Sequence, residues 1–285
     1  MTNEPLKVTW TSTLDSANDA KFIDKIIQYG HVNYLSFPLN HPGEITKRTS
    51  EFSYPTVEAR ILRDQAIYDA QLRRLRPIIE SDAMIQITAN QENDIDPFWN
   101  NGFFNGSDAK LGYAFLVDRN PQLVVEVGAG NSTKFFRRAI HDFGLQTRLL
   151  AIDPAPRADL AQVADEIIES SVFDVHLAVF DRLEAGDILF WDGSHMVCNG
   201  SDVTRLFLEV LPRLKPGVIV HMHDIMMPYE AYHNGEVGDV SFPEQYMLGT
   251  YLLSVASAKV LLPVHYLWRT KAITENGLSF WFVTE

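Results

Sequence analysis

The sequence predicts an α/β protein with a mostly parallel sheet that has helices on both faces. From about residue 107, short apolar runs typical of buried strands alternate with amphipathic helical stretches, as they do in βαβ units. Near the end, the apolar segments KVLLPVHYLW and LSFWFVTE are separated by a polar stretch that ends at Asn276-Gly277, which predicts a C-terminal antiparallel hairpin. The first hundred residues lack this alternation.

Residues 1–105 are predicted to be a helical and irregular extension that caps the substrate site. The segment 29–55 is rich in Pro, Asn, Ser and aromatic residues and has no sustained period, which is typical of functional loops. After it, apolar residues share one helical face between Thr56, a candidate N-cap, and Pro77, a candidate stop. We also consider residues 1–100 a candidate contact of a homo-oligomer.

Residues 106–285 are predicted to form one domain, in which each strand is a short apolar run and the helices carry apolar stripes. The expected order is helix 107–117, strand 123–127, a helix over FFRRAIHDF, strand 148–153, a helical stretch from 157, strand 166–170, strand 187–192, helix 201–214 and strand 217–224. In the last of these strands, we expect His221 to point away from His223 and to pack or form a hydrogen bond.

Composition and charge narrow the class of protein. The 285-residue chain has 46% hydrophobic and 21% charged residues, as globular proteins do, and its net charge of −13 disfavours nucleic acid as a partner. Its one cysteine, Cys198, fits a reducing compartment, and its first residues lack the apolar core of a signal peptide. No apolar run approaches the length of a membrane span. We therefore expect a cytoplasmic protein.

Polar residues and glycines follow the first two predicted strands, where open parallel sheets bind ligands. The first strand continues into Glu126-Val127-Gly128-Ala129-Gly130-Asn131-Ser132, whose glycines let a ligand approach the backbone. Asp153 follows the second strand, 23 residues after Gly130, where a carboxylate can accept hydrogen bonds from ribose hydroxyls.

Two kinds of nucleotide ligand are possible for this loop. A nicotinamide-binding G-x-G-x-x-G sequence has its third glycine where this chain has Thr133. Glu126 suits a ligand that carries positive charge, such as an amino-acid ammonium beside a sulfonium. A nicotinamide-dependent oxidoreductase remains an alternative that these two residues disfavour.

Several ordered segments resemble those of class I S-adenosylmethionine (SAM)-dependent methyltransferases, which have a Rossmann-like, seven-stranded sheet. VVEVGAGNST, LLAIDPAPR and GDILFWDGSH resemble three of the family's motifs, and the likeness extends over about residues 103–262. The long segment from GDILFWDGSH to HMHDIMMPYE, followed by FPEQYML, is similar to a bacterial subgroup found in secondary metabolism. The resemblance implies that SAM is bound by Glu126, Gly128, Gly130, Ser132, Asp153, Phe173, Asp174 and Asp192.

The same resemblance implies a catalytic role for Asp192 and His195. In related metal-dependent small-molecule O-methyltransferases, the general base lies three residues after the strand-end aspartate, and here that position is His195, whose pKa suits a base. The corresponding metal ligands would be Asp192, His223 and Asp224. Because His223 stands where an oxygen ligand is expected, the candidate ions include Mg, Mn, Fe and Zn, and the absence of a metal stays open.

The segment 228–246 is polar and aromatic and follows the presumed site, so we expect it to form an acceptor wall. Its candidate substrate contacts are Tyr229, Tyr232, His233, Glu244 and Tyr246. The sequence therefore predicts methyl transfer to a small-molecule acceptor, most simply at oxygen. An enzyme that cyclises SAM instead of transferring its methyl group remains a second alternative.

Overall fold

The computed structural model divides the chain into two compact units, Met1–Lys47 and Arg48–Glu285. The structure describes residues 51–156, 160–230 and 242–284, all of which belong to the second unit. No helix among these residues is long and apolar enough to cross a membrane.

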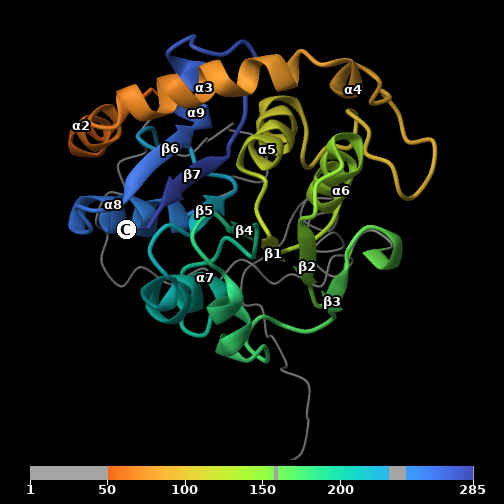
Figure 1. Ribbon diagram of the computed structural model, residues 1–285. Helices are drawn as coiled ribbons and strands as arrows, with labels where there is room; N and C mark the ends of the chain where they lie inside the picture. Colours follow the sequence, from red (N-terminus) through yellow and green to blue (C-terminus); the bar gives the residue numbers. More distant parts are fainter. Residues whose placement is uncertain (1–50, 157–159, 231–241, 285) are drawn as a thin grey trace, which may run out of the picture. The chain divides into compact units, whose positions relative to one another are not determined.

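The second unit is built on a seven-stranded sheet, which confirms the predicted fold class (Figure 1). The strand order is β3-β2-β1-β4-β5-β7-β6; the first five are parallel, and β7 pairs antiparallel with both β5 and β6. The strands are β1 (Leu123–Val127), β2 (Arg148–Ile152), β3 (Glu166–Ile168), β4 (Ile188–Trp191), β5 (Ile219–Met222), β6 (Lys259–Pro263) and β7 (Phe280–Val283).

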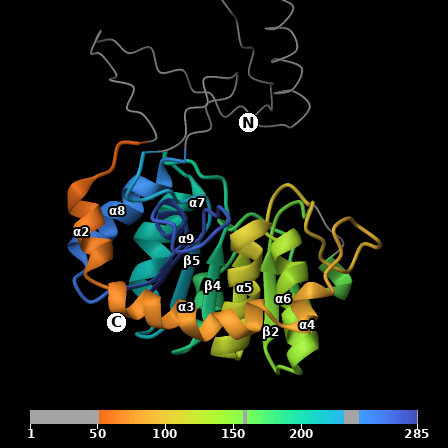
Figure 2. The same ribbon diagram turned by 90° about the horizontal axis from the view of Figure 1, so that it is seen from above.

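Helices cover both faces of this sheet. Figure 1 shows α3, α5 and α6 on one side and α7 on the other, and in Figure 2 the first three lie in front of the sheet. The helices are α2 (Pro55–Leu62), α3 (Gln65–Ile79), α4 (Asp82–Ile85), α5 (Gly106–Arg119), α6 (Asn131–Phe143), α7 (Asp202–Arg205), α8 (Glu244–Ser254) and α9 (Val264–Arg269). Short turns of other helical types are η1 (Leu160–Gln162), η2 (Leu177–Arg182), η3 (Leu206–Val210) and η4 (Leu211–Arg213).

The core explains why the central strands could be predicted. Strands β1, β4 and β5 are buried along their whole length, as expected of parallel strands that are covered on both faces. In the sequence these strands are short, mostly apolar runs, with Glu126 in β1 and His221 in β5 as the exceptions. The polar groups that follow them therefore stand out at the carboxyl edge of the sheet.

Three local expectations were wrong. The helix predicted from Thr56 is two helices, α2 and α3, and Pro77 lies inside the last turn of α3 instead of stopping it. The segment KVLLPVHYLW is a strand only as far as Pro263, after which α9 begins. His221 lies with its ring 5.9 Å from that of His223, because residues two apart in a strand face the same side; it does pack, against Phe190.

Candidate active site

The loop after β1 lies directly against the end of β4. These strands are neighbours in register, with Val127 opposite Trp191. Gly128 has φ +81°, and a Cβ added there would lie 1.7 Å from the carbonyl oxygen of Asp192. Only glycine combines this backbone conformation with so close an approach. The contact fixes the glycine loop beside the residues that follow β4.

Glu126 is tied to the first turn of α6. Its carboxylate accepts hydrogen bonds from the hydroxyls of Ser132, at 2.5 Å, and Thr133, at 2.6 Å. Burial raises the pKa of Glu126 to about 8, although both hydroxyls oppose this shift. The structure thus places Glu126 and Ser132 together, below the glycine loop.

Asp153 holds the other side of the same loop. Its Oδ2 accepts a hydrogen bond from the Ala129 N–H at 2.9 Å, and its Oδ1 accepts one from the Ala155 N–H at 2.8 Å. Among the described residues beyond its immediate neighbours, no atom would lie within 4 Å of a Cβ added at Gly130. The loop between Gly128 and Ser132 therefore has open space beside it, next to the Asp153 carboxylate.

Phe173 and Asp174 are exposed after β3. The Arg205 guanidinium lies over the Phe173 ring, 5.6 Å from its centroid. Arg205 also donates to the carbonyls of Val172, by a short hydrogen bond, and of Val175, at 2.8 Å. The Arg205 guanidinium, from α7, thus fixes this turn.

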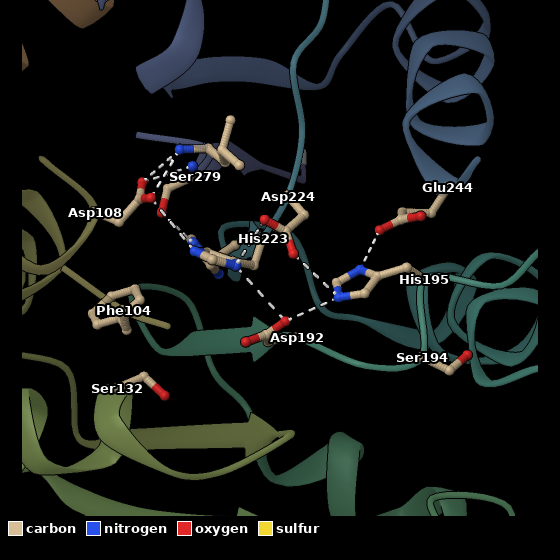
Figure 3. Close-up of polar contacts among 12 residues, drawn as sticks. Phe104, Asp108, Ser132, Asp192, Ser194, His195, His223, Asp224, Glu244 and Ser279 are labelled. Carbon is tan, nitrogen blue, oxygen red and sulfur yellow. Dashed lines mark hydrogen bonds and ion pairs between the residues drawn. The ribbon is translucent and has the colours of Figure 1, made fainter. Parts of the chain in front are cut away.

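His195 is surrounded by carboxylates (Figure 3). Its Nδ1 lies 2.5 Å from Glu244 Oε1. Its Nε2 lies 3.4 Å from Asp192 Oδ1 and 3.3 Å from Asp224 Oδ2. Burial alone would lower the pKa of His195, but the hydrogen bond to Glu244 and the surrounding carboxylates raise it to about 9.

The three predicted metal ligands lie together at the ends of β4 and β5. Each of Asp192, His223 and Asp224 offers one ligand atom, and these atoms lie within 4.8 Å of one another. His223 Nδ1 is 3.7 Å from Asp192 Oδ1 and 3.5 Å from Asp224 Oδ1. These two carboxylates raise the pKa of His223 well above its usual value, against the effect of burial.

The donor set fits a divalent ion. Four carboxylates, from Asp108, Asp192, Asp224 and Glu244, face two imidazoles, so the cluster is negative even when both rings are protonated. Two carboxylates and one imidazole suit manganese, iron or zinc better than magnesium, which prefers oxygen ligands.

The sequence did not reveal two of the contacts around this cluster. Asp108, in the first turn of α5, has its Oδ2 3.5 Å from His223 Nε2, and the ring of Phe104 lies 5.7 Å from that of His223. Neither belongs to a motif, and α5 also contains Lys110 and Asp118, so no local signal marked Asp108. Glu244, predicted as a substrate contact, is buried with its carboxylate on His195.

Of the other predicted acceptor contacts, the structure describes Tyr229 and Tyr246. The hydroxyls of Tyr246 and Tyr54 donate to the Glu230 carboxylate, the former by a short hydrogen bond. Tyr229 lies under the Arg269 guanidinium, 4.3 Å from ring centroid to carbon. Tyr232 and His233 lie outside the described residues. A hollow beside α8 is lined by Val197, Phe207, Pro243, Tyr246, Met247, Thr250, Tyr251, Ser254 and Val255.

Comparisons with known proteins found one matching family and several similar solved structures. Residues 125–225 match a family described as a methyltransferase domain, whereas no curated protein matches the sequence. The chain is similar to an O-methyltransferase from Bacillus cereus in complex with S-adenosylhomocysteine (SAH), at 15% identity, over 80% of this chain and 100% of that one, with a TM-score of 0.39.

Two further solved structures are similar at the same level. The SAH-bound methyltransferase PaMTH1 of Podospora anserina is 12% identical over 97% of this chain and 100% of that one, with a TM-score of 0.39. A structure of CmcI with Mg-SAM is 14% identical over 72% and 84%, with a TM-score of 0.40. Likeness at this level carries no argument about ligands. The match of residues 125–225 to a methyltransferase domain agrees with the resemblance to class I SAM-dependent methyltransferases.

Proposed function

We propose that this protein is a SAM-dependent O-methyltransferase that acts on a small-molecule acceptor in secondary metabolism, in the cytoplasm. The observation that carries the proposal is the position of His195. An imidazole is held between Glu244 and two strand-end aspartates, and the residue that begins this segment, Asp192, touches the glycine loop.

The cofactor would lie along the carboxyl edge of the sheet. Its methionine end would lie against Gly128, Gly130 and Ser132, and its ribose hydroxyls would donate to Asp153. Glu126 would act mainly by shaping the loop, because its oxygens are already bonded to two hydroxyls. Phe173 and Asp174 would flank the adenine, and Asp192 would contact the cofactor from the end of β4.

The reaction would be a direct displacement. The acceptor hydroxyl gives its proton to His195 Nε2 while its oxygen attacks the sulfonium methyl, and the carbon–sulfur electron pair returns to sulfur, so that SAH leaves. Glu244 on Nδ1 orients the ring and stabilises the imidazolium that forms. His195 must enter this step neutral, and a pKa of about 9 opposes that in the ion-free site.

Asp192, His223 and Asp224 would hold a divalent cation. When bound, the ion would polarise the acceptor oxygen and neutralise the carboxylates that raise the His195 pKa. His195 is not in the set of side chains that can share one ion among the described residues. It therefore stays available as the base.

The acceptor would approach from the side of Tyr229, Glu244 and Tyr246. We propose a small molecule because the net charge of −13 disfavours nucleic acid. Tyr232 and His233 belong to the same proposed acceptor wall, and residues 1–105 would form its cap and a homo-oligomer contact.

The first test is calorimetry of the wild-type protein with SAM, SAH and NAD. We expect binding of SAM and SAH and none of NAD; tight NAD binding without SAM binding contradicts the proposal. Incubation with SAM alone, analysed for methylthioadenosine, tests the cyclisation alternative.

The second test follows SAH release with a panel of hydroxylated small molecules, catechol among them. His195→Gln is expected to lower kcat by about 10²–10⁴-fold and to leave the Kd for SAM unchanged. Glu244→Gln is expected to lower kcat less, because the base remains. A His195→Gln enzyme with wild-type kcat would exclude His195 as the base.

A further inference from the structure

His223 has two ring nitrogens in different surroundings. Nδ1 faces Asp192 and Asp224, within the set of possible metal ligands. Nε2 faces the opposite way and is buried. Within the described part of the chain, its nearest acidic group is Asp108 Oδ2, at 3.5 Å (Figure 3). A neutral imidazole carries its one proton on either nitrogen. The Nδ1 atom of His223 can therefore coordinate an ion only if the proton is on Nε2.

Asp108 is itself held in place by the backbone that leads into β7. Both of its oxygens accept the Leu278 N–H, at 2.8 and 2.9 Å, and Oδ1 also accepts the Ser279 N–H, at 2.8 Å. Asp108 is buried, as is His223. A Cβ added at Gly277 would lie 2.6 Å from Asp108 Oδ1. The carboxylate is thus clamped between α5 and the chain that precedes β7.

We propose that Asp108 is a positioning residue that keeps the His223 proton on Nε2, so that Nδ1 presents its lone pair to an ion shared with Asp192 and Asp224. The inference rests on the metal site of the proposed function. A carboxylate behind a ligating histidine fixes its tautomer and ring orientation, and removing such a partner typically weakens metal binding about 10–100-fold. The other tautomer would direct a proton at the two ligand carboxylates.

The position of Asp108 suits this role better than a purely structural one. The N–H groups of Leu278 and Ser279 would need only a hydrogen-bond acceptor, and a neutral amide side chain could supply one. Asp108 instead lies behind the one nitrogen ligand of the cluster, and Phe104 covers the imidazole from the side. This arrangement also explains how a histidine can stand where related enzymes were expected to have an oxygen ligand.

The test measures Mn²⁺ binding by calorimetry and by electron paramagnetic resonance. We expect Asp108→Asn to raise the Kd for Mn²⁺ about 10–100-fold and to leave the Kd for SAM unchanged. The control is Asp187→Asn: Asp187 is also a buried aspartate that accepts backbone N–H groups, those of Gln122, Leu123 and Glu184. It precedes β4, at the end away from the site, and Asp187→Asn should leave Mn²⁺ binding unchanged.

A double-mutant cycle shows whether Asp108 acts through His223. In a His223→Asn background, Asp108→Asn should cause no further loss of Mn²⁺ affinity. Wild-type Mn²⁺ affinity in a folded Asp108→Asn protein, or additive losses in the cycle, would overturn the inference. If Asp108→Asn does not fold, Asp108→Ser is measured in the same way. A wild-type protein that binds SAM but no Mn²⁺ would overturn the metal site and this inference together, and would leave the methyltransferase proposal intact.

Discussion

At the residue scale, two side chains of the proposed site stand on an unusual backbone. His195 has φ +62° and Asp224 has φ +57°, a region that non-glycine residues occupy at a cost of about 1 kcal/mol or more. Both residues follow the ends of neighbouring strands, and the left-handed turn brings their side chains to one point. The contacts of His195 with Glu244, Asp192 and Asp224 offset this strain. Strain of this kind is typical of functional sites.

Glu126 gives a prediction about pH. Its pKa is about 8 in the folded protein and near 4.5 in the unfolded chain. Between these values the unfolded chain has released the proton that the folded protein retains, so this group lowers stability as pH rises from about 4.5 to 8. Glu126→Gln removes the effect. We expect the variant to be more stable than the wild type at pH 8, by up to about 4 kcal/mol in the free energy of unfolding, and to match it near pH 4.5.

Thermal melts across this pH range check the Glu126 prediction. Glu166→Gln is the matched control, because the hydrogen bond from Arg182 lowers the pKa of Glu166, so its removal should give no stabilisation at pH 8. A Glu126→Gln protein that melts lower than the wild type at pH 8 would mean that the carboxylate is ionised in the folded state.

At the scale of elements, the contact between β1 and β4 decides whether the site forms. Gly128→Ala would bring a methyl group to 1.7 Å from the Asp192 carbonyl oxygen, at φ +81°. Gly144 is the matched control: it also has a positive φ, +60°, but an added Cβ would meet nothing within 4 Å. We expect Gly144→Ala to cost about 1 kcal/mol. Gly128→Ala should cost clearly more and abolish SAM binding in calorimetry. If Gly128→Ala and Gly144→Ala lowered the free energy of unfolding equally, backbone strain alone would explain why position 128 is glycine.

The sequence predicted the parts of the site that lie at strand ends. Asp192 and His223-Asp224 follow apolar runs, and adjacent parallel strands bring such residues together. The contact between His195 and Glu244 spans 49 positions and depends on where α8 begins, which no local pattern determines. Asp108 is hidden in the same way, because its partners in the loop before β7 meet it only after folding. Helix α9 was missed because VHYLW is apolar enough for either a strand or a helix.

At the scale of the molecule, helices α2 and α3 pack on the sheet domain. Helix α3 contacts α5 and β6, and α2 contacts α8. Arg60 is buried and donates to Asp64, at 2.7 Å, and to the carbonyl of Leu252, at 2.9 Å. Asp64 in turn accepts the Val260 N–H, at 2.8 Å. This buried network joins α2 and the turn after it to α8 and β6, so α2 and α3 should fold with the sheet.

Arg60→Met tests whether α2 and α3 fold together with the sheet. Methionine replaces arginine with an apolar side chain of similar length, and Asp64 is then buried without its cation. Breaking a buried pair in this way typically costs about 3–5 kcal/mol, so the melting temperature should fall by roughly 6 °C or more. Arg63→Ala is the control: the Arg63 side chain is exposed and, among the described residues, its hydrogen bond is to the Ala256 carbonyl, at 3.2 Å, so its loss should cost less than about 0.5 kcal/mol. Circular dichroism reports on the helices, and fluorescence reports on the five tryptophans, of which Trp191 and Trp281 lie in strands β4 and β7. The two signals should change together in wild type and variant, as one cooperative unit requires. If circular dichroism changed first, α2 and α3 would form a separately folding cap, and the boundary predicted at residues 105 and 106 would then divide two folding units.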